Sequence, residues 1–154
     1  MALTLTSPTF ESGDPIPAKY TCEGENVSPP LSWRYGPEGT ESLALVCEDP
    51  DAPGGTFIHW VLYDIPADMD GLPEDVPPDT KLSWGAAQGR NDFGNVGYGS
   101  PCPPVGETHR YYFRLYALDE QLDLPPGATR HQLVSRLQDH VLEQAELIGR
   151  FRRG

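Results

Sequence analysis

The sequence predicts a mainly β protein, with an antiparallel sheet at the core and helices packed at one end. Two long runs, residues 56–65 and 109–118, are rich in β-branched and aromatic residues, which favour strands. The 16 glycines and 17 prolines form about a fifth of the chain, above the usual share of about 12%, as expected of many turns. Helical spacing is found only after Thr129, and strands followed by a terminal helix indicate this architecture.

The first half of the chain is expected to hold a series of short strands. Residues 3–6 alternate leucine with threonine, the pattern of a half-buried edge strand, and extension resumes at residues 31–33. The continuous apolar run SLALVC at residues 42–47 indicates a buried strand. Residues 56–65 form the strongest predicted strand. Residues 10–30, interrupted by glycines and prolines, are predicted to be a connector with little regular structure.

The second half of the chain is predicted to contain a loop, two strands and a terminal helix. Residues 66–80 are acidic and proline-rich and predict a solvated loop, with a short strand expected at residues 81–85. After the strand at 109–118, Thr129 and Gln132 match the capping-box spacing. Apolar residues then recur at helical intervals and predict a C-terminal helix or helix pair that ends at Gly149. The chain shows no internal repeats and is predicted to be a single domain over residues 1–154.

Charge and cysteine content restrict the classes of function. The net charge of −12 repels phosphate backbones and anionic lipids, which argues against nucleic-acid binding. No apolar run approaches the ~18 residues of a membrane span and no signal peptide is recognisable, so no integral membrane association and a cytoplasmic location are predicted. Cys22, Cys47 and Cys102 are odd in number and lack CxxC spacing, which predicts free thiols rather than a disulfide framework or a zinc knuckle.

Chemistry is expected around a glycine- and proline-rich loop at residues 89–108, which leads into the strand that begins at His109. If the strands from residues 42, 56 and 109 are neighbours, Asp49, His59 and His109 converge at one end of the sheet. A carboxylate beside an imidazole fixes its tautomer and raises its pKa. Two imidazoles beside free loop amides would then hold an anion, and binding would strengthen as the pH falls toward about 6.5.

The sequence supports four other kinds of site less well. Asp49, His59 and His109 could act as a metal triad, but they lie on different elements without compact spacing, so no metal and no cofactor is predicted. Ser100 lacks the second glycine of a nucleophile elbow. Cys102 and His109 could form a thiol nucleophile pair on proximity alone. The glycines of residues 94–99 do not form a dinucleotide fingerprint.

Two long stretches resemble the signature regions of a known family. They are EDPDAP at residues 48–53, followed by FIHW at 57–60, and GYGSPCPP at 97–104, leading to HRY at 109–111. Both are similar to the phosphatidylethanolamine-binding protein (PEBP) family, and most closely to its prokaryotic branch of Raf-kinase-inhibitor-like (YbhB/YbcL-like) proteins. The resemblance extends over nearly the whole chain.

This resemblance implies an antiparallel β-sandwich-like fold with peripheral helices, and a pocket for phosphate, phosphoryl-ethanolamine or a similar anion. The residues implied to bind the anion are Asp49, His59, His109, Tyr111 and Pro103. The residues implied to support the pocket are Asp51, Arg110 and Pro101; Asp51 would brace its loop, and Arg110 would pair with an acidic residue.

The expected function is that of a non-enzymatic binding protein for a small anion, or for a phosphorylated or acidic group of a partner protein. An inhibitor of proteases or a modulator of a kinase pathway, acting through the loops around the pocket, is the alternative, and a weak hydrolase is a third. Whether the chain forms a homodimer is left open.

Overall fold

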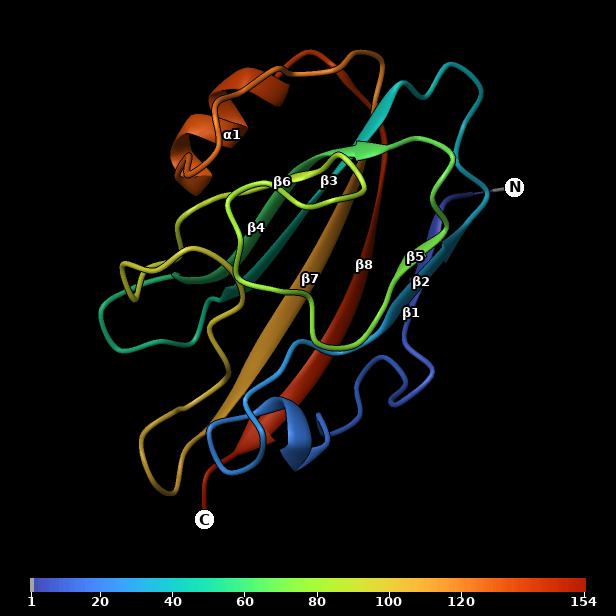
Figure 1. Cartoon of the computed structure of the whole chain (residues 1–154). Helices are drawn as coiled ribbons and strands as arrows, with labels where there is room; N and C mark the ends of the chain where they lie inside the picture. Colours follow the sequence, from blue (N-terminus) through green and yellow to red (C-terminus); the bar gives the residue numbers. More distant parts are fainter. Residues whose placement is uncertain (1) are drawn as a thin grey trace.

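The computed structural model describes residues 2–154 and contains two antiparallel sheets, a 3-10 helix and an α-helix. The elements are β1 (Thr4–Thr6), η1 (Ala18–Tyr20), β2 (Leu31–Arg34), β3 (Ser42–Asp49), β4 (Phe57–Pro66), β5 (Gly71–Leu72), β6 (Ala87–Gln88), β7 (Thr108–Leu118), α1 (Arg130–Leu137) and β8 (Val141–Arg152). The large sheet has the order β6-β4-β3-β7-β8, and the small sheet has the order β1-β2-β5. Figure 1 shows the small sheet and α1 on opposite sides of the large sheet.

The core has two layers, one on each face of the large sheet. The layer toward the small sheet joins Trp33 of β2 with Trp60 of β4 and Phe113 of β7. The layer on the other face packs Leu133 and Leu137 of α1 against β3 and β4. Strand β7 alternates between buried inward residues and more exposed outward ones, as expected of a strand with one fully covered face. Each large apolar side chain buried in this way contributes about 1.5–3 kcal/mol.

The predicted strands at residues 42–47, 56–65 and 109–118 are confirmed as β3, β4 and β7. All eight residues of β3 are buried, because β3 lies between β4 and β7 and is covered on both faces. The strands expected at residues 3–6 and 31–33 are confirmed as β1 and β2. The short strand expected at residues 81–85 lies at β6 instead, and Lys81 contributes only a single bridge to Ala87.

The C-terminal region differs from the prediction. The capping box is present, because the Thr129 hydroxyl accepts from Gln132 N–H and the Gln132 side chain accepts from Thr129 N–H. The helix ends at Leu137, however, and Asp139 adopts a left-handed conformation with φ 71°. The prediction of helix through Gly149 is wrong, since β8 pairs with β7 along its length.

The same apolar residues of β8 fit a two-residue period once the sheet is formed. Leu147, Gly149 and Phe151 are buried, and the residues between them are more exposed. Gly149 pairs with Tyr111, and a Cβ at Gly149 would lie 2.4 Å from Cγ1 of Ile16. Glycine at this position therefore reflects close packing inside a sheet, not the end of a helix.

The cysteine prediction is also wrong for two of the three residues. Cys22 and Cys102 form a disulfide, with Cα atoms 5.4 Å apart and a sequence separation of 80. Cys47 is free and buried in β3, as predicted. Two cysteines so far apart along the chain are brought together only by the tertiary fold, so local spacing carried no signal of the bond.

Among the residues that the structure describes, no helix is long and apolar enough to cross a membrane.

Candidate functional site

A cavity of about 150 Å³ opens at the end of the large sheet where β3 ends and β7 begins. Its lining residues are Asp49, Ala52, Pro53, Phe57, His59, Phe93, Cys102, Pro103, Pro104, His109 and Tyr111. The cavity therefore brings together all five residues that the family resemblance implied for anion binding.

A β-bulge in β4 places His59 at this cavity. Cys47 pairs with Trp60 and Glu48 pairs with Ile58, so His59 is the extra residue between them. Strict alternation would send His59 and Trp60 to opposite faces of the sheet. The bulge instead puts His59 beside Tyr111, with the two ring centroids 5.3 Å apart in an edge-on arrangement.

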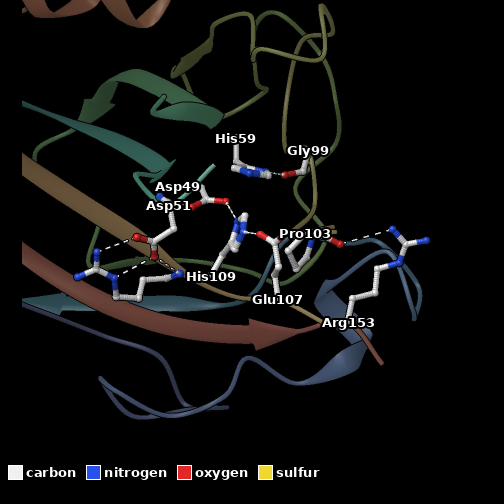
Figure 2. Close-up of polar contacts among 9 residues, drawn as sticks. Asp49, Asp51, His59, Gly99, Pro103, Glu107, His109 and Arg153 are labelled. Carbon is white, nitrogen blue, oxygen red and sulfur yellow. Dashed lines mark hydrogen bonds and ion pairs between the residues drawn. The ribbon is translucent and has the colours of Figure 1, made fainter. Parts of the chain in front are cut away.

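His109 is held by carboxylates on both ring nitrogens (Figure 2). Its Nδ1 lies 2.6 Å from Oδ2 of Asp49, and its Nε2 lies 2.9 Å from Oε1 of Glu107. Burial lowers the pKa of His109, but the hydrogen bonds to Glu107 and Asp49 outweigh burial and leave this pKa above its ordinary value. The protonated ring then donates to both carboxylates.

The pKa of His59 is shifted in the opposite direction. Its Nδ1 donates to the backbone carbonyl of Gly99 over 2.6 Å, as Figure 2 shows. A carbonyl oxygen can only accept, so the neutral ring carries its proton on Nδ1 and leaves Nε2 with a free lone pair. Burial lowers the pKa of His59 and outweighs the opposing effects of the Gly99 carbonyl, Asp49 and Asp92. The pKa values of the two histidines are therefore shifted in opposite directions.

Tyr111 provides an unpaired polar atom at the cavity. Its side chain is fully buried, and its hydroxyl is the one buried side-chain N or O atom within residues 2–154 that lacks a hydrogen-bond partner. Burial, followed by the negative charge of Asp49, raises the pKa of Tyr111 far above its ordinary value. The hydroxyl therefore keeps its proton and can donate it to a ligand oxygen.

The mouth of the cavity is aromatic, a feature that the sequence analysis missed. Phe93 is 49% exposed and packs edge-on against Phe57 at 4.7 Å and His59 at 5.5 Å between ring centroids. The Asn91 side chain shapes this turn by accepting from the backbone N–H of Phe93 and of Asn95. An exposed aromatic residue within a turn that begins with asparagine is the signal that could have identified Phe93.

Asp51 and Arg110 lie beside the cavity but do not line it. Arg110 donates from Nε to Oδ2 of Asp51 over 2.9 Å and from Nη2 to Oδ1 over 2.8 Å. The hydrogen bond from Arg110 lowers the pKa of Asp51 to about 2. Asp51 N–H in turn donates to Oδ1 of Asp49, over 2.8 Å. This chain of contacts fixes the orientation of Asp49.

The rim of the cavity is tied to the N-terminal part of the chain. Cys102 lines the cavity and is bonded to Cys22, whose N–H donates to the Pro101 carbonyl. The neighbouring Pro103 also lines the cavity, and its carbonyl accepts from Arg153 at 3.5 Å. Pro101 is buried behind the rim and does not line the cavity.

The alternative chemistries find little geometric support. Cys102 cannot act as a thiolate while it is bonded to Cys22. Ser100 is only 6% exposed and does not line the cavity. Within residues 2–154, no three His, Cys, Asp or Glu side chains gather closely enough to hold a metal ion.

This fold and cavity define a class of antiparallel β protein with a small, largely apolar pocket that holds a few polar side chains. The chain matches the model of the phosphatidylethanolamine-binding protein family over residues 6–152 and belongs to that family. The resemblance seen in the two signature stretches is thereby confirmed.

Relatives and solved structures agree with this assignment. A UPF0098 protein of Methanothermobacter thermautotrophicus is 51% identical over 152 residues, which cover 99% of this chain and 100% of the relative. One from Aquifex aeolicus is 50% identical over 153 residues, which cover 98% of this chain and 89% of the relative. The crystal structure of Escherichia coli YbcL, described as a member of the mammalian PEBP family, gives a TM-score of 0.92 at 35% identity, with all of both chains covered. That of a PEBP homologue from Chlamydia trachomatis gives 0.91 at 40% identity over 99% of both chains.

Proposed function

We propose that this chain is a binding protein, not an enzyme, whose cavity holds a small anion such as phosphate or the phosphoryl group of phosphoryl-ethanolamine. The observation that carries this proposal is the buried, unpaired hydroxyl of Tyr111. A buried hydroxyl without a partner costs about 1–3 kcal/mol. A ligand oxygen that accepts from Tyr111 would recover much of that cost.

His109 supports an anion through its hydrogen-bond donors and not through net charge, because its ring lies between two carboxylates. Protonated His109 is a buried donor, and Asp49 already occupies its Nδ1. Glu107, which holds Nε2, has a side chain 54% exposed to solvent. An incoming anion can displace Glu107 because that carboxylate can return to water at little cost. Glu107 therefore acts as an internal competitor for the position that we assign to the ligand.

The remaining lining supports capture rather than chemistry. The two candidate nucleophiles are either oxidised, as in Cys102, or away from the cavity, as in Ser100. We further propose that the bound group belongs to a small molecule or to an acidic or phosphorylated group of a partner protein that reaches over Phe93.

The cytoplasmic location remains a prediction. The disulfide joins two exposed cysteines, and such bonds are typical of oxidising compartments, although intracellular proteins of hyperthermophiles also contain them. Cell fractionation, with the thiols trapped before lysis, would locate the protein and report the state of this bond.

Isothermal titration calorimetry of the purified protein with inorganic phosphate and with phosphoryl-ethanolamine at pH 6 tests the function. We expect saturable binding at one site per chain. Two-dimensional NMR of the histidine rings should show shifts at His59 and His109, with His131 and His140 serving as internal controls. Absence of heat and of shifts for both ligands at millimolar concentration would contradict the proposal.

A further inference from the structure

The cavity offers its ligand an acceptor as well as donors. His59 is 4% exposed, and its Nδ1 is committed to the Gly99 carbonyl. Its Nε2 has no hydrogen-bond partner within residues 2–154, and the His59 side chain lines the cavity. In the neutral ring, this nitrogen can only accept a hydrogen bond.

The charged and titratable groups around His59 do not favour adding a second proton to it. Asp49 at the end of β3 and Asp92 in the loop above favour the charged ring, whereas His109 on β7 opposes it. Asp49 and Glu107 are both hydrogen-bonded to His109. Burial is the largest influence on His59 and favours the neutral ring.

The remaining polar groups of the cavity are donors. Tyr111 offers its O–H, and His109 offers Nε2–H once Glu107 moves away. A ligand that pairs with Tyr111, His109 and His59 must accept two hydrogen bonds and donate one. A fully deprotonated oxyanion cannot donate, and it would place an oxygen lone pair against the lone pair of His59 Nε2. A tetrahedral oxyanion that carries one P–OH group satisfies all three positions.

We propose that the cavity selects the monoprotonated form of a phosphate or phosphate monoester and rejects oxyanions of the same shape and charge that carry no proton. The inference rests on the proposed function and makes it specific. Sulfate monoesters are rejected because they remain fully deprotonated. The phosphodiester of an intact phospholipid head group is rejected for the same reason, whereas the free monoester phosphoryl-ethanolamine is accepted.

Methyl phosphate and methyl sulfate provide a matched test, since both are tetrahedral monoanions at pH 5.5. Phosphate monoesters lose their second proton with a pKa of about 6, so methyl phosphate keeps its P–OH at pH 5.5 and has lost most of it at pH 8. We expect methyl sulfate to bind about 10- to 100-fold more weakly than methyl phosphate at pH 5.5 by calorimetry, the effect of leaving a buried acceptor unpaired. Methyl phosphate itself should weaken by about 50- to 100-fold at pH 8.

A second pair of ligands distinguishes the sources of the phosphate. Phosphoryl-ethanolamine is a monoester and glycerophosphoethanolamine is a diester, and both carry the same ammonium group. We expect the monoester to bind and the diester to bind at least tenfold more weakly. His59→Gln should reduce the discrimination between methyl phosphate and methyl sulfate, because an amide can present either a donor or an acceptor.

The outcomes separate this inference from the proposed function. Equal binding of methyl phosphate and methyl sulfate in the unmodified protein would overturn the inference and leave anion binding intact, since a protonated His59 would then be the donor. In that case calorimetry in buffers of different ionisation enthalpy would also detect uptake of a proton by the protein. Failure of every ligand to bind would overturn the proposed function and the inference with it.

Discussion

The Glu107 carboxylate lies 2.9 Å from Nε2 of His109, on the opposite side of the ring from Asp49. A buried imidazole is thus held between one buried and one half-exposed carboxylate. The half-exposed carboxylate of Glu107 therefore occupies the position on His109 that we assign to the ligand, although Glu107 does not line the cavity.

Replacing Glu107 with glutamine should strengthen anion binding. The neutral amide competes less well for protonated His109, and the loss of one negative charge lowers repulsion of the ligand. Partly exposed ion pairs contribute about 0.2–1 kcal/mol, so affinity for phosphate should rise by up to about fivefold in calorimetry. Glu38→Gln removes the same charge from an exposed loop away from the cavity and should leave the affinity within twofold. Weaker binding in Glu107→Gln would show that Glu107 helps to hold the ligand.

The two histidines should give the free energy of unfolding opposite dependences on pH. The raised pKa of His109 contributes stability that is complete below the unfolded value of about 6.5 and is lost as pH rises through the folded pKa. The lowered pKa of His59 makes the fold lose stability as pH falls below about 6.5, because only the unfolded state then gains the proton.

Urea unfolding between pH 5 and pH 9 would separate these contributions. His59→Gln should flatten the acidic side of the profile, and His109→Gln should flatten the alkaline side. If either substitution flattened the opposite side, the direction assigned to that histidine would be wrong.

Opening the Cys22–Cys102 disulfide should lower stability. The bond closes a loop across 80 residues of sequence, and removal of a native disulfide of this kind costs about 2–5 kcal/mol. The double variant Cys22→Ser/Cys102→Ser and the reduced wild-type protein should show similar losses in urea unfolding. Adding a reductant to the double variant should have no further effect, because Cys47 is unpaired. Equal stability of the oxidised and reduced wild-type protein would contradict the structural role of the bond.

Gly149→Ala distinguishes the strand β8 from the helix that the sequence suggested. In a helix, alanine would stabilise the protein by about 0.8–1 kcal/mol relative to glycine. In β8 the new Cβ would lie 2.4 Å from the Ile16 side chain, and such overpacking costs about 1–3 kcal/mol. We therefore expect a lower unfolding midpoint for Gly149→Ala. The matched variant Gly54→Ala, which has open space around it, should change stability little.

Local pattern predicted the three central strands of the large sheet but neither of its edge strands, β6 and β8. Strands β4 and β7 are recognisable because β-branched and aromatic residues dominate them. Leu147 and Phe151 in β8 are separated by four residues, a spacing that suits one face of a helix and one face of a strand equally well. Only the pairing of β8 with β7 decides between them, and that pairing is tertiary.

The sequence motifs predicted which polar residues line the cavity. Asp49, His59, His109 and Tyr111 stand in the two signature stretches, and they all line one cavity. The different states of the two histidines were not predictable, because they depend on contacts made across the fold. His59 meets the Gly99 carbonyl 40 residues away, and the bulge that turns it inward is a feature of strand pairing.

Tyr111→Phe tests the central claim, that an unpaired hydroxyl in the cavity awaits an anion. The variant keeps the ring and loses only the hydroxyl, so phosphate binding measured by calorimetry at pH 6 should weaken by about 1.5–3 kcal/mol, the range for a hydrogen bond to a charged group. Stability without ligand should stay the same or rise, because no hydrogen bond is lost. Tyr116→Phe, on the other face of the same strand and away from the cavity, is the control and should bind as the wild type does. Unchanged phosphate affinity in Tyr111→Phe, or a stability loss typical of a broken hydrogen bond, would contradict the account.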